Sequence, residues 1–223
     1  MKIVLTRERG KNDALSTWLP EYATVHEVPL TTTTYFAEGT VRDALRASPV
    51  VGTFRSLVVT SERSMSYVPL ALAATASDVE VFSVGPTTSE ALRAQGVAVR
   101  AQGDGAAVTL VRQISHGPVL VIGAATMREE LGLALRAKGL EVTVVPCYET
   151  MALALDSDDV ALLADADVVF IGAPSAWLVA RDAVRDDALV VVPGRSTGAV
   201  VHLDHANVLE GWGPTLRSRL GAL

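Results

Sequence analysis

Residues 119–148 read VLVIGAATMREELGLALRAKGLEVTVVPCY and contain the pattern that decides the fold. A short run of mostly β-branched residues, 119–122, is followed by a helix-like segment that ends at Gly139. A second apolar run, 142–145, is closed by Pro146. Short buried strands that alternate with amphipathic helices are typical of parallel sheets with helical crossovers. The stretch therefore predicts a strand, a helix and a second, parallel strand.

The same alternation runs along the whole chain and predicts the α/β fold class. Short apolar runs closed by Gly, Pro, Ser or Thr are predicted to be strands. Helix-like segments such as 88–96, which has a capping hydroxyl at its start and a glycine at its end, lie between them. The predicted strands are 3–5, 25–28, 57–59, 79–84, 97–99, 119–122, 142–145, 168–171 and 189–192.

The quoted stretch has a counterpart near the start of the chain. Pro29 and Pro146, which follow corresponding apolar runs, are 117 positions apart. Gly85 and Gly194, which follow the next pair of runs, are 109 positions apart. Self-similarity at an interval of about 110 residues predicts two similar α/β domains rather than a solenoid.

The two prolines also indicate where the chain passes between the domains. Proline is poorly tolerated inside a central strand but is accepted at its end, so we interpret 29–34 and 146–151 as inter-domain crossings. The first domain is then discontinuous and consists of 1–30 and 150–223, and the second comprises 34–146. We expect two similar parallel-sheet α/β/α domains, joined by two linker crossings, with a cleft between them.

Composition and charge exclude several classes of protein. Of the 223 residues, 49% are hydrophobic and 20% are charged, which suits a packed core rather than disorder. The single cysteine, Cys147, excludes a disulfide framework and a CxxC zinc site. A net charge of −6 argues against a broad nucleic-acid interface, and no apolar run approaches the roughly 20 residues that span a membrane. Because no signal-peptide pattern is found either, we expect a cytoplasmic protein with neither nucleic acid nor membrane as partner.

The sequence contains no motif for a cofactor or a metal ion. Phosphate-binding and dinucleotide-binding glycine patterns are absent. His202 and His205 are close in sequence but lack further ligands at a metal-site spacing, so we interpret them as polar residues around a strand end. Asp156, Asp158 and Asp159 precede an apolar helical run and are interpreted as a solvated helix N-terminus. We therefore expect no metal and no cofactor.

Hydroxyl, glycine and arginine residues gather instead where the predicted strands end. In open parallel sheets, ligands bind at the carboxyl ends of the strands, where helix N-termini offer unpaired N–H groups to anions. For any single turn, the alternative is that the hydroxyl only caps a helix. Several such turns together favour a shared polyanionic ligand. The candidates are Thr6 and Arg7; Thr60, Ser61 and Arg63; Gly85 and Thr88; Ser175; and Thr197.

These turns resemble those of the uroporphyrinogen-III synthase family. The resemblance is carried by Leu5-Thr6-Arg7, 59–63, 83–88, and 139–142 followed by Cys147-Tyr148-Glu149-Thr150. It spans about residues 3–220, and its specificity lies in the order and spacing of the motifs. Two turns depart from the family pattern: 171–175, where the family usually has Thr-Ser-Pro-Ser, and 192–197, where it has Ile-Gly-x-Thr-Thr.

The resemblance implies an enzyme that closes linear hydroxymethylbilane to uroporphyrinogen III, with loss of water and inversion of ring D. It also implies a two-domain fold, a small-molecule substrate and no cofactor, and we expect a monomer. Tyr148, in the Tyr-Glu-Thr run, is the candidate general acid; the alternative is a linker tyrosine that only packs. The turn residues are the candidate substrate-binding residues, with Arg7 and Arg63 suited to carboxylates.

Two other classes of function stay open at this point. One is a non-catalytic module of the same fold that binds a tetrapyrrole or another polycarboxylate, although two domains leave no residues for an output domain. The other is a hinged binding protein of the periplasmic type, against which the absence of a signal-peptide pattern counts.

Overall fold

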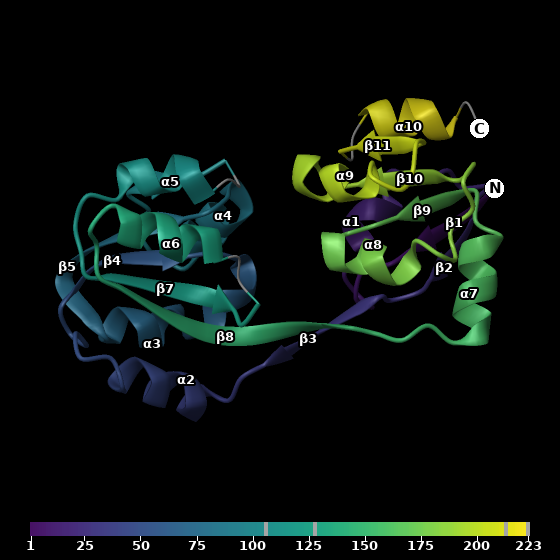
Figure 1. The fold of residues 1–223 in the computed structure, drawn as a ribbon. Coiled ribbons are helices and arrows are strands. Elements are labelled where there is room, and N and C mark those ends of the chain that lie inside the picture. The colour runs from purple at the N-terminus through teal and green to yellow at the C-terminus, as the bar shows by residue number, and fades with distance from the viewer. Residues whose placement is uncertain (105–106, 127–128, 212–213, 222–223) are drawn as a thin grey trace. The chain divides into compact units, whose positions relative to one another are not determined.

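The protein divides into two compact α/β units, seen in a computed structural model (Figure 1). Unit 1 comprises Met1–Thr32 and Met151–Leu223, and unit 2 comprises Thr33–Thr150. Both contain parallel sheets, which confirms the predicted fold class. The structure describes residues 1–104, 107–126, 129–211 and 214–221.

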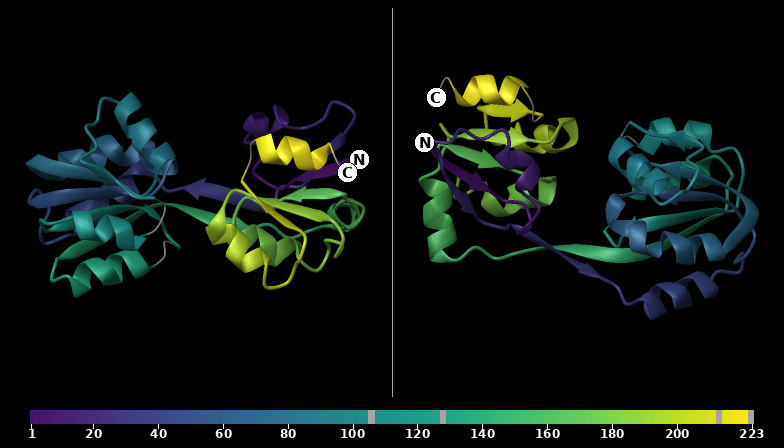
Figure 2. Two further views of the ribbon diagram at one scale, coloured as in Figure 1. Left: turned by 90° about the horizontal axis from the view of Figure 1, so that it is seen from above. Right: turned by 180° about the vertical axis from the view of Figure 1, so that it is seen from behind.

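Unit 1 is built around a five-stranded sheet with the order β11-β10-β9-β1-β2, in which every pair of neighbours is parallel. Helices lie on both faces of this sheet (Figures 1 and 2). The elements of unit 1 are β1 (Lys2–Leu5), α1 (Asp13–Ser16), β2 (Thr24–Glu27), α7 (Ser157–Ala164), β9 (Val168–Phe170), α8 (Pro174–Ala180), β10 (Leu189–Val192), α9 (Arg195–Val201), β11 (Val208–Glu210) and α10 (Pro214–Leu220).

The alternating side chains of β1 contribute to two separate cores. Val4 packs on one face of the sheet with Leu163 of α7 and Trp177 of α8. Ile3 packs on the other face with Leu216 of α10. Successive residues of a strand point to opposite faces, so a sheet covered by helices on both sides requires apolar residues at every position. This requirement explains why the central strands β9 and β10 are continuous apolar runs, whereas the edge strand β2 is partly polar.

The interpretation of the acidic cluster in unit 1 is confirmed, and so is that of His205, whereas His202 is an exposed residue at the C-terminal end of α9. Asp156 caps α7, because its Oδ1 accepts hydrogen bonds from the backbone N–H groups of Asp158 (2.9 Å) and Asp159 (2.8 Å). His205 is buried, and its Nε2 lies 2.8 Å from the carbonyl oxygen of Ala188, in the turn before β10. Asp156 and His205 therefore each stabilise an end of a secondary-structure element.

Unit 2 contains a six-stranded sheet with the order β3-β8-β7-β4-β5-β6. The pairs from β8 to β6 are parallel. None of the described helices of the chain is long and apolar enough to cross a membrane. The elements of this sheet and its helices are β3 (Thr31–Tyr35), α2 (Glu38–Arg46), β4 (Phe54–Val59), the 3₁₀ helix η1 (Glu62–Tyr67), α3 (Val68–Ala73), β5 (Thr75–Ser83), α4 (Pro86–Ala94), β6 (Ala101–Gln102), α5 (Ala107–Gln113), β7 (Val119–Ala124), α6 (Glu129–Ala137) and β8 (Val142–Ala152).

The core of unit 2 is divided by its sheet in the same way. Leu57 of β4 packs with Leu45 of α2 and Tyr67 of η1 on one face. Its neighbour Val58 packs on the other face with Leu110 of α5. The central strand is thus buried on both sides, and both layers of helices depend on it.

A β-bulge interrupts the register between β7 and β8. Gly123 lies opposite Pro146, and Ala124 lies opposite Tyr148, so Cys147 is an extra residue on β8. A bulge is one of the few places in a sheet that accept proline, because the ladder is already interrupted there. The prediction that the strand ends at Pro146 is therefore wrong, and β8 continues to Ala152.

Of the two segments interpreted as crossings, 146–151 lies within β8, and 29–34 enters β3 at Thr31. The boundaries between the units, after Thr32 and after Thr150, fall inside β3 and β8. These two strands are hydrogen-bonded neighbours in the sheet.

One of the nine predicted strands is wrong. Residues 97–99 have no regular structure, and β6 covers Ala101–Gln102 instead. Val97 and Val99 nevertheless pack against the core of unit 2, so burial without strand pairing explains their apolar character. The strands β3 and β11 are not among the predicted strands.

We propose that each unit is an independently folding domain. Unit 2 has its own sheet and a core on each face, so residues 33–150 expressed alone should unfold cooperatively and protect their core amides from exchange. Urea unfolding followed by circular dichroism, together with amide exchange, measures both properties. As a control, Leu57→Ala should destabilise the isolated unit by about 2–5 kcal/mol. An isolated unit without protected amides would contradict the proposal.

Candidate active site

The sheet of unit 2 brings together the predicted site residues that are far apart in its sequence. Tyr148 of β8 lies opposite Ala124, the last residue of β7, and β4 is the next strand in the sheet. Thr60 and Ser61 directly follow β4. Because neighbouring strands are about 4.8 Å apart, the backbones of Tyr148 and Ser61 are roughly 10 Å apart along one edge. Gly85 follows β5, one strand further on.

Tyr148 is a core residue whose hydroxyl is uncommitted. Its side chain is 5% exposed and belongs to the cluster that contains Cys147 and Val145. In a regular strand Cys147 and Tyr148 would point to opposite faces, and the bulge lets both join one core. The ring packs against Tyr35 at a centroid distance of 6.1 Å. Within the described part of the chain, the Tyr148 hydroxyl has no hydrogen-bond partner.

A second tyrosine of the same core is committed to the fold. The hydroxyl of Tyr67 donates a hydrogen bond to the carbonyl oxygen of Phe36. Burial raises the pKa of Tyr67, and Cys147, Tyr35 and Glu38 raise this pKa further because they disfavour a second negative charge nearby. Tyr67 and Tyr148 thus share one apolar cluster but differ in what their hydroxyls do.

Cys147 is placed to be unreactive. Its thiol is buried, and burial raises its pKa from 9.0 to about 11, although a hydrogen bond from the backbone of Gly123 acts in the opposite direction. A thiol with such a pKa is protonated at neutral pH and is therefore a poor nucleophile. Its position in the bulge makes it a packing residue beside Tyr148.

The turn after β4 uses its hydroxyls to hold the backbone. Thr60 Oγ1 donates to the carbonyl oxygen of Ile122 on β7 (3.2 Å). Ser61 Oγ accepts a hydrogen bond from the backbone N–H of Arg63 (3.2 Å) and so caps η1. The capping alternative therefore describes what Ser61 does in the free protein. Arg63 is half-buried on η1, and the roles of all three residues toward a ligand stay predictions.

The turn after β5 presents backbone N–H groups. α4 begins at Pro86, and its N-cap, Gly85, supplies no side-chain hydrogen bond. The N–H groups of the first turn of a helix have no partner within the helix, which leaves those of Thr87 and Thr88 available to an anion. A Cβ at Gly85 would meet nothing within 4 Å, so the space in front of this turn is open. The Thr88 side chain itself is buried.

The carboxyl edge of the sheet of unit 1 carries the remaining predicted residues. Thr6 follows β1, is 1% exposed, and donates from Oγ1 to the carbonyl oxygen of Phe170 at the end of β9 (2.5 Å). Arg7 packs its side-chain methylenes over Gly172, where a Cβ would lie 3.2 Å from Arg7 Cγ. The Arg7 guanidinium has no hydrogen-bond or ion-pair partner among the described residues. Gly172 thus lets Arg7 extend across the end of β9, a role that its sequence pattern does not reveal.

The last two predicted residues lie on short helices at the same edge. Ser175 is exposed in the first turn of α8, which follows β9. Thr197 is 2% exposed in α9, which follows β10. Parallel pairing of β1, β9 and β10 therefore places Arg7, Ser175 and Thr197 at one edge in strand order.

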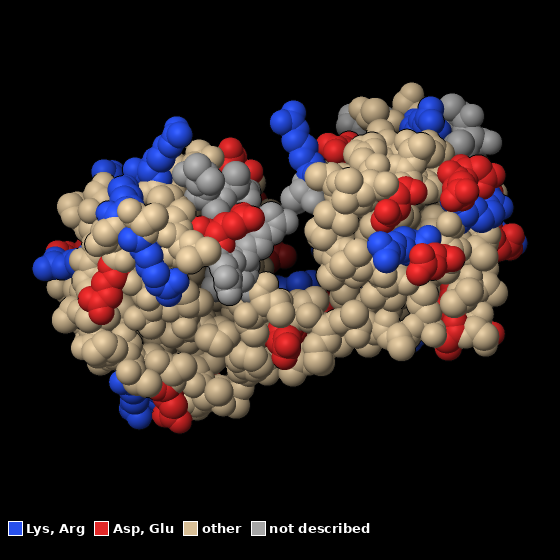
Figure 3. Space-filling model, viewed as in Figure 1, with Lys and Arg blue, Asp and Glu red and all other residues tan. Residues whose placement is uncertain are grey.

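Charges are mixed on the face of the molecule that Figure 3 shows, and the described residues form no cluster of metal ligands. Figure 3 shows basic and acidic side chains interspersed on the visible face of the molecule, without a broad region of one sign. Among the described residues, no group of three or more His, Cys, Asp or Glu side chains is placed to hold a metal ion. At the turns described above, single arginines and backbone N–H groups are the sources of positive potential for an anionic ligand.

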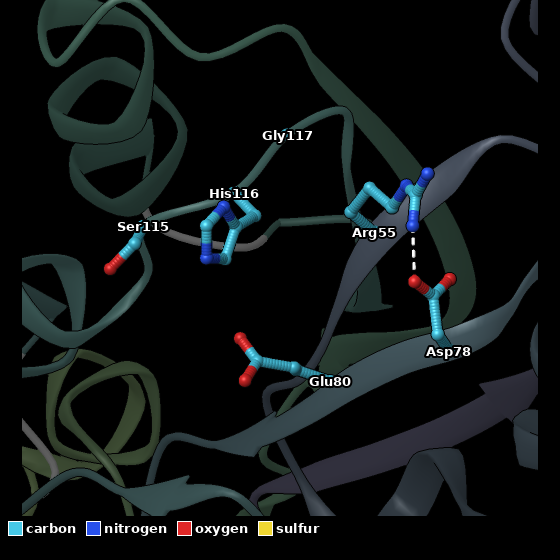
Figure 4. Close-up of a pocket in the computed structure, with 6 residues that line it drawn as sticks. All are labelled: Arg55, Asp78, Glu80, Ser115, His116 and Gly117. Carbon is cyan, nitrogen blue, oxygen red and sulfur yellow. Dashed lines mark hydrogen bonds and ion pairs between the residues drawn. The ribbon is translucent and has the colours of Figure 1, made fainter.

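A pocket of about 490 Å³ in unit 2 lies away from these turns (Figure 4). Its lining residues Arg55 and Glu80 belong to the amino-terminal side of the β4–β5 pairing, opposite the edge that carries Tyr148. Arg55 is ion-paired with Asp78, and Glu80 with Arg100 (3.2 Å). Because these charges neutralise one another, we do not include this pocket in the candidate site.

Comparison with known proteins relates the chain to one enzyme family. A family model described as uroporphyrinogen-III synthase HemD matches residues 21–203. No curated protein sequence matches the chain. Among solved structures, a mutant uroporphyrinogen III synthase from the extremely thermophilic bacterium Thermus thermophilus superposes with a TM-score of 0.70 at 16% identity, covering 100% of this chain and 96% of the other. The uroporphyrinogen-III synthetase from Helicobacter pylori gives a TM-score of 0.63 at 14% identity, with 99% and 98% covered.

The buried thiol beside Tyr148 predicts a loss of stability in alkali. Between pH 9 and about 11 the unfolded chain loses the Cys147 proton while the folded protein keeps it, so the unfolded state is favoured as the pH rises. The free energy of unfolding should fall by up to about 1.4 kcal/mol per pH unit from this group. Urea unfolding at pH 8, 9 and 10 should show a shallower decline for Cys147→Ala than for the wild type. Equal declines in the two proteins would contradict a contribution from Cys147. The loss of stability in alkali would then be due to Tyr67, whose pKa is also raised.

Proposed function

Because the chain belongs to the uroporphyrinogen-III synthase family, whose enzymes act in tetrapyrrole biosynthesis, we propose that it converts linear hydroxymethylbilane to uroporphyrinogen III. The observation that carries the proposal is the match of the family model over residues 21–203. The Tyr148 hydroxyl, without a partner among the described residues, supports it because it provides a free donor at an edge lined by candidate ligand-binding turns.

The proposed reaction removes one molecule of water, breaks one carbon–carbon bond and forms two. The ring A hydroxymethyl group loses its hydroxyl, which takes up a proton, while the pyrrole nitrogen lone pair stabilises the resulting cation. The substituted α-carbon of ring D attacks the exocyclic carbon and forms a spiro-pyrrolenine. The old bond from ring D to its bridging carbon then breaks, and a new bond forms from that bridging carbon to the free α-carbon of ring D. Loss of the proton from this carbon restores the pyrrole and balances the proton taken up at the start.

Tyr148 is proposed to donate the hydrogen bond, or the proton, to the departing hydroxyl. A phenol is a weak acid, but the pyrrole nitrogen supplies most of the driving force, so a well-placed donor suffices. The donor must be fixed, and here it is held by the surrounding core and by the tilted contact with Tyr35. General acid assistance by a positioned group typically contributes about 10²–10⁴-fold in rate.

The turns are proposed to hold the carboxylate side chains of the substrate. Arg7 and Arg63 would bind carboxylates through paired N–H donors. Gly85 and Thr88 would contribute the open N-terminus of α4. Holding a flexible linear chain in one bent conformation is itself catalytic, because it removes entropy before the ring closes. The proposed set is completed by Thr6, Thr60, Ser61, Ser175 and Thr197.

A test of the activity compares the product isomers. Hydroxymethylbilane released in water closes without inverting ring D and gives the type I isomer. With the wild-type protein present, the type III isomer should predominate after oxidation and chromatographic separation of the products. A protein that binds the bilane but leaves only the type I isomer would instead be the non-catalytic module, and the proposed reaction would be wrong.

A pair of tyrosine variants separates catalysis from packing. Tyr148→Phe should lower the rate of type III formation roughly 10- to 1,000-fold, which corresponds to about 1.5–4 kcal/mol of transition-state stabilisation. Its melting temperature should stay near that of the wild type, because the ring is kept and no hydrogen bond to a described residue is lost.

Tyr67→Phe is the matched control in the same cluster. It removes a structural hydrogen bond to Phe36 and should cost roughly 1 kcal/mol of stability while the activity per folded molecule is retained. Rates within twofold of the wild type for Tyr148→Phe would restore the packing interpretation of this residue.

A further inference from the structure

Unit 1 contains a pocket of about 620 Å³ on the β2 side of β1. One wall is the turn after β1, with Arg9 and Lys11, and another is the segment after β2, with Pro29 and Thr31. The N-terminal end of α7 closes the pocket with its N-cap residue, Asp156. All of its lining residues belong to unit 1, so the pocket exists within a single compact unit.

Backbone hydrogen bonds hold these walls together. The N–H of Leu30 donates to the carbonyl oxygen of Thr6 (3.1 Å), and the N–H of Leu153 donates to that of Leu30 (2.9 Å). Leu30 is itself buried, with an exposed fraction of 0%. Leu30 therefore links the turn after β1, the segment after β2 and the residues that precede α7. The walls of the pocket are held by the fold itself.

The charges in the pocket are unequally satisfied. Three carboxylates and two cations line it. Asp156 is engaged as the cap of α7, and Asp159 lies in the first turn of that helix, where the helix dipole favours a carboxylate. Glu8 also has an interaction partner. Arg9 and Lys11, in contrast, have neither a side-chain hydrogen bond nor an ion pair to any described residue. The groups that still lack a partner are thus mainly cationic, and an anionic ligand would complete them.

We propose that this pocket is a carboxylate-binding subsite, in which Arg9 and Lys11 hold an acidic side chain of the substrate. The identity of that substrate rests on the function proposed above. Arg7 packs over Gly172, on the β9 side of β1, whereas Arg9 and Lys11 line the β2 side. The end of β1 would then bind carboxylates on both of its sides, through an arginine fork and a lysine point charge.

Equilibrium binding of uroporphyrin III, the fluorescent oxidised form of the proposed product, tests the subsite without requiring turnover. Arg9→Ala/Lys11→Ala should weaken its binding roughly ten- to hundredfold at low salt, and the difference should shrink as salt rises. The matched control is Arg46→Ala/Arg93→Ala, which removes the same charge from the last turns of α2 and α4 and should change binding less than about twofold. Arg9→Lys/Lys11→Arg should recover most of the affinity.

Amide chemical shifts locate the effect. Uroporphyrin III should perturb the amides of residues 9–11 and 31–32, and inorganic phosphate at equal concentration should perturb them less. Equal perturbation by phosphate, or equal loss of affinity in both double variants, would overturn the subsite. If the wild type forms uroporphyrinogen III and Arg9→Ala/Lys11→Ala binds uroporphyrin III normally, only the subsite is wrong; if the wild type neither forms the type III isomer nor binds the porphyrin, the proposed function fails first.

Discussion

Parallel pairing places the carboxyl ends of neighbouring strands on one edge of a sheet, and the candidate site depends on this constraint. It brings Tyr148 and Ser61 to one edge although 86 residues separate them in the chain. The two sheets also solve the same local problem in the same way. Thr6 and Thr60 each follow a strand and donate a side-chain hydrogen bond to a carbonyl oxygen of the neighbouring strand. The hydroxyl ties two strand ends together at the point where regular pairing stops, so the turns beyond it start from a fixed backbone.

The sequence predicts the central strands well, because burial on both faces makes them continuous apolar runs. It does not reveal contacts that depend on which strand lies next to which. Pro146 reads as a strand end in the sequence, since the bulge that accommodates it is visible only in the register with Gly123. Residues 97–99 resemble a strand, because an apolar run indicates burial and not strand pairing. Arg9 is not found from the sequence for the same reason: its pocket requires Leu30 to link three segments distant in the chain.

Tyr67 and Tyr148 of unit 2 belong to one core but differ in what their hydroxyls bind. Tyr67 satisfies its hydroxyl with the Phe36 carbonyl, as buried polar groups normally must. Tyr148 leaves its hydroxyl without a partner among the described residues. The Tyr148 hydroxyl is not one of the buried polar atoms that lack a partner, so it is open to water or a ligand and carries no desolvation penalty. The bulge at Cys147 sets this arrangement, because it inserts one residue before Tyr148 and changes the side of the strand to which the ring points.

An acidic protein that binds a polycarboxylate must separate its own carboxylates from those of the ligand. The net charge of −6 would repel such a ligand at long range, but at about 0.15 M ionic strength exposed charges are screened within about 8 Å. Recognition then depends on short-range groups. Asp156 shows how an acid can lie beside Arg9 and Lys11 without pairing with them: its side-chain oxygen Oδ1 accepts two hydrogen bonds from the backbone of α7, which stabilise its negative charge. Arg7 and Lys11 keep their charges uncompensated by any described residue. The distribution of partners, rather than the total charge, therefore decides which sign of ligand this edge of the sheet can accept.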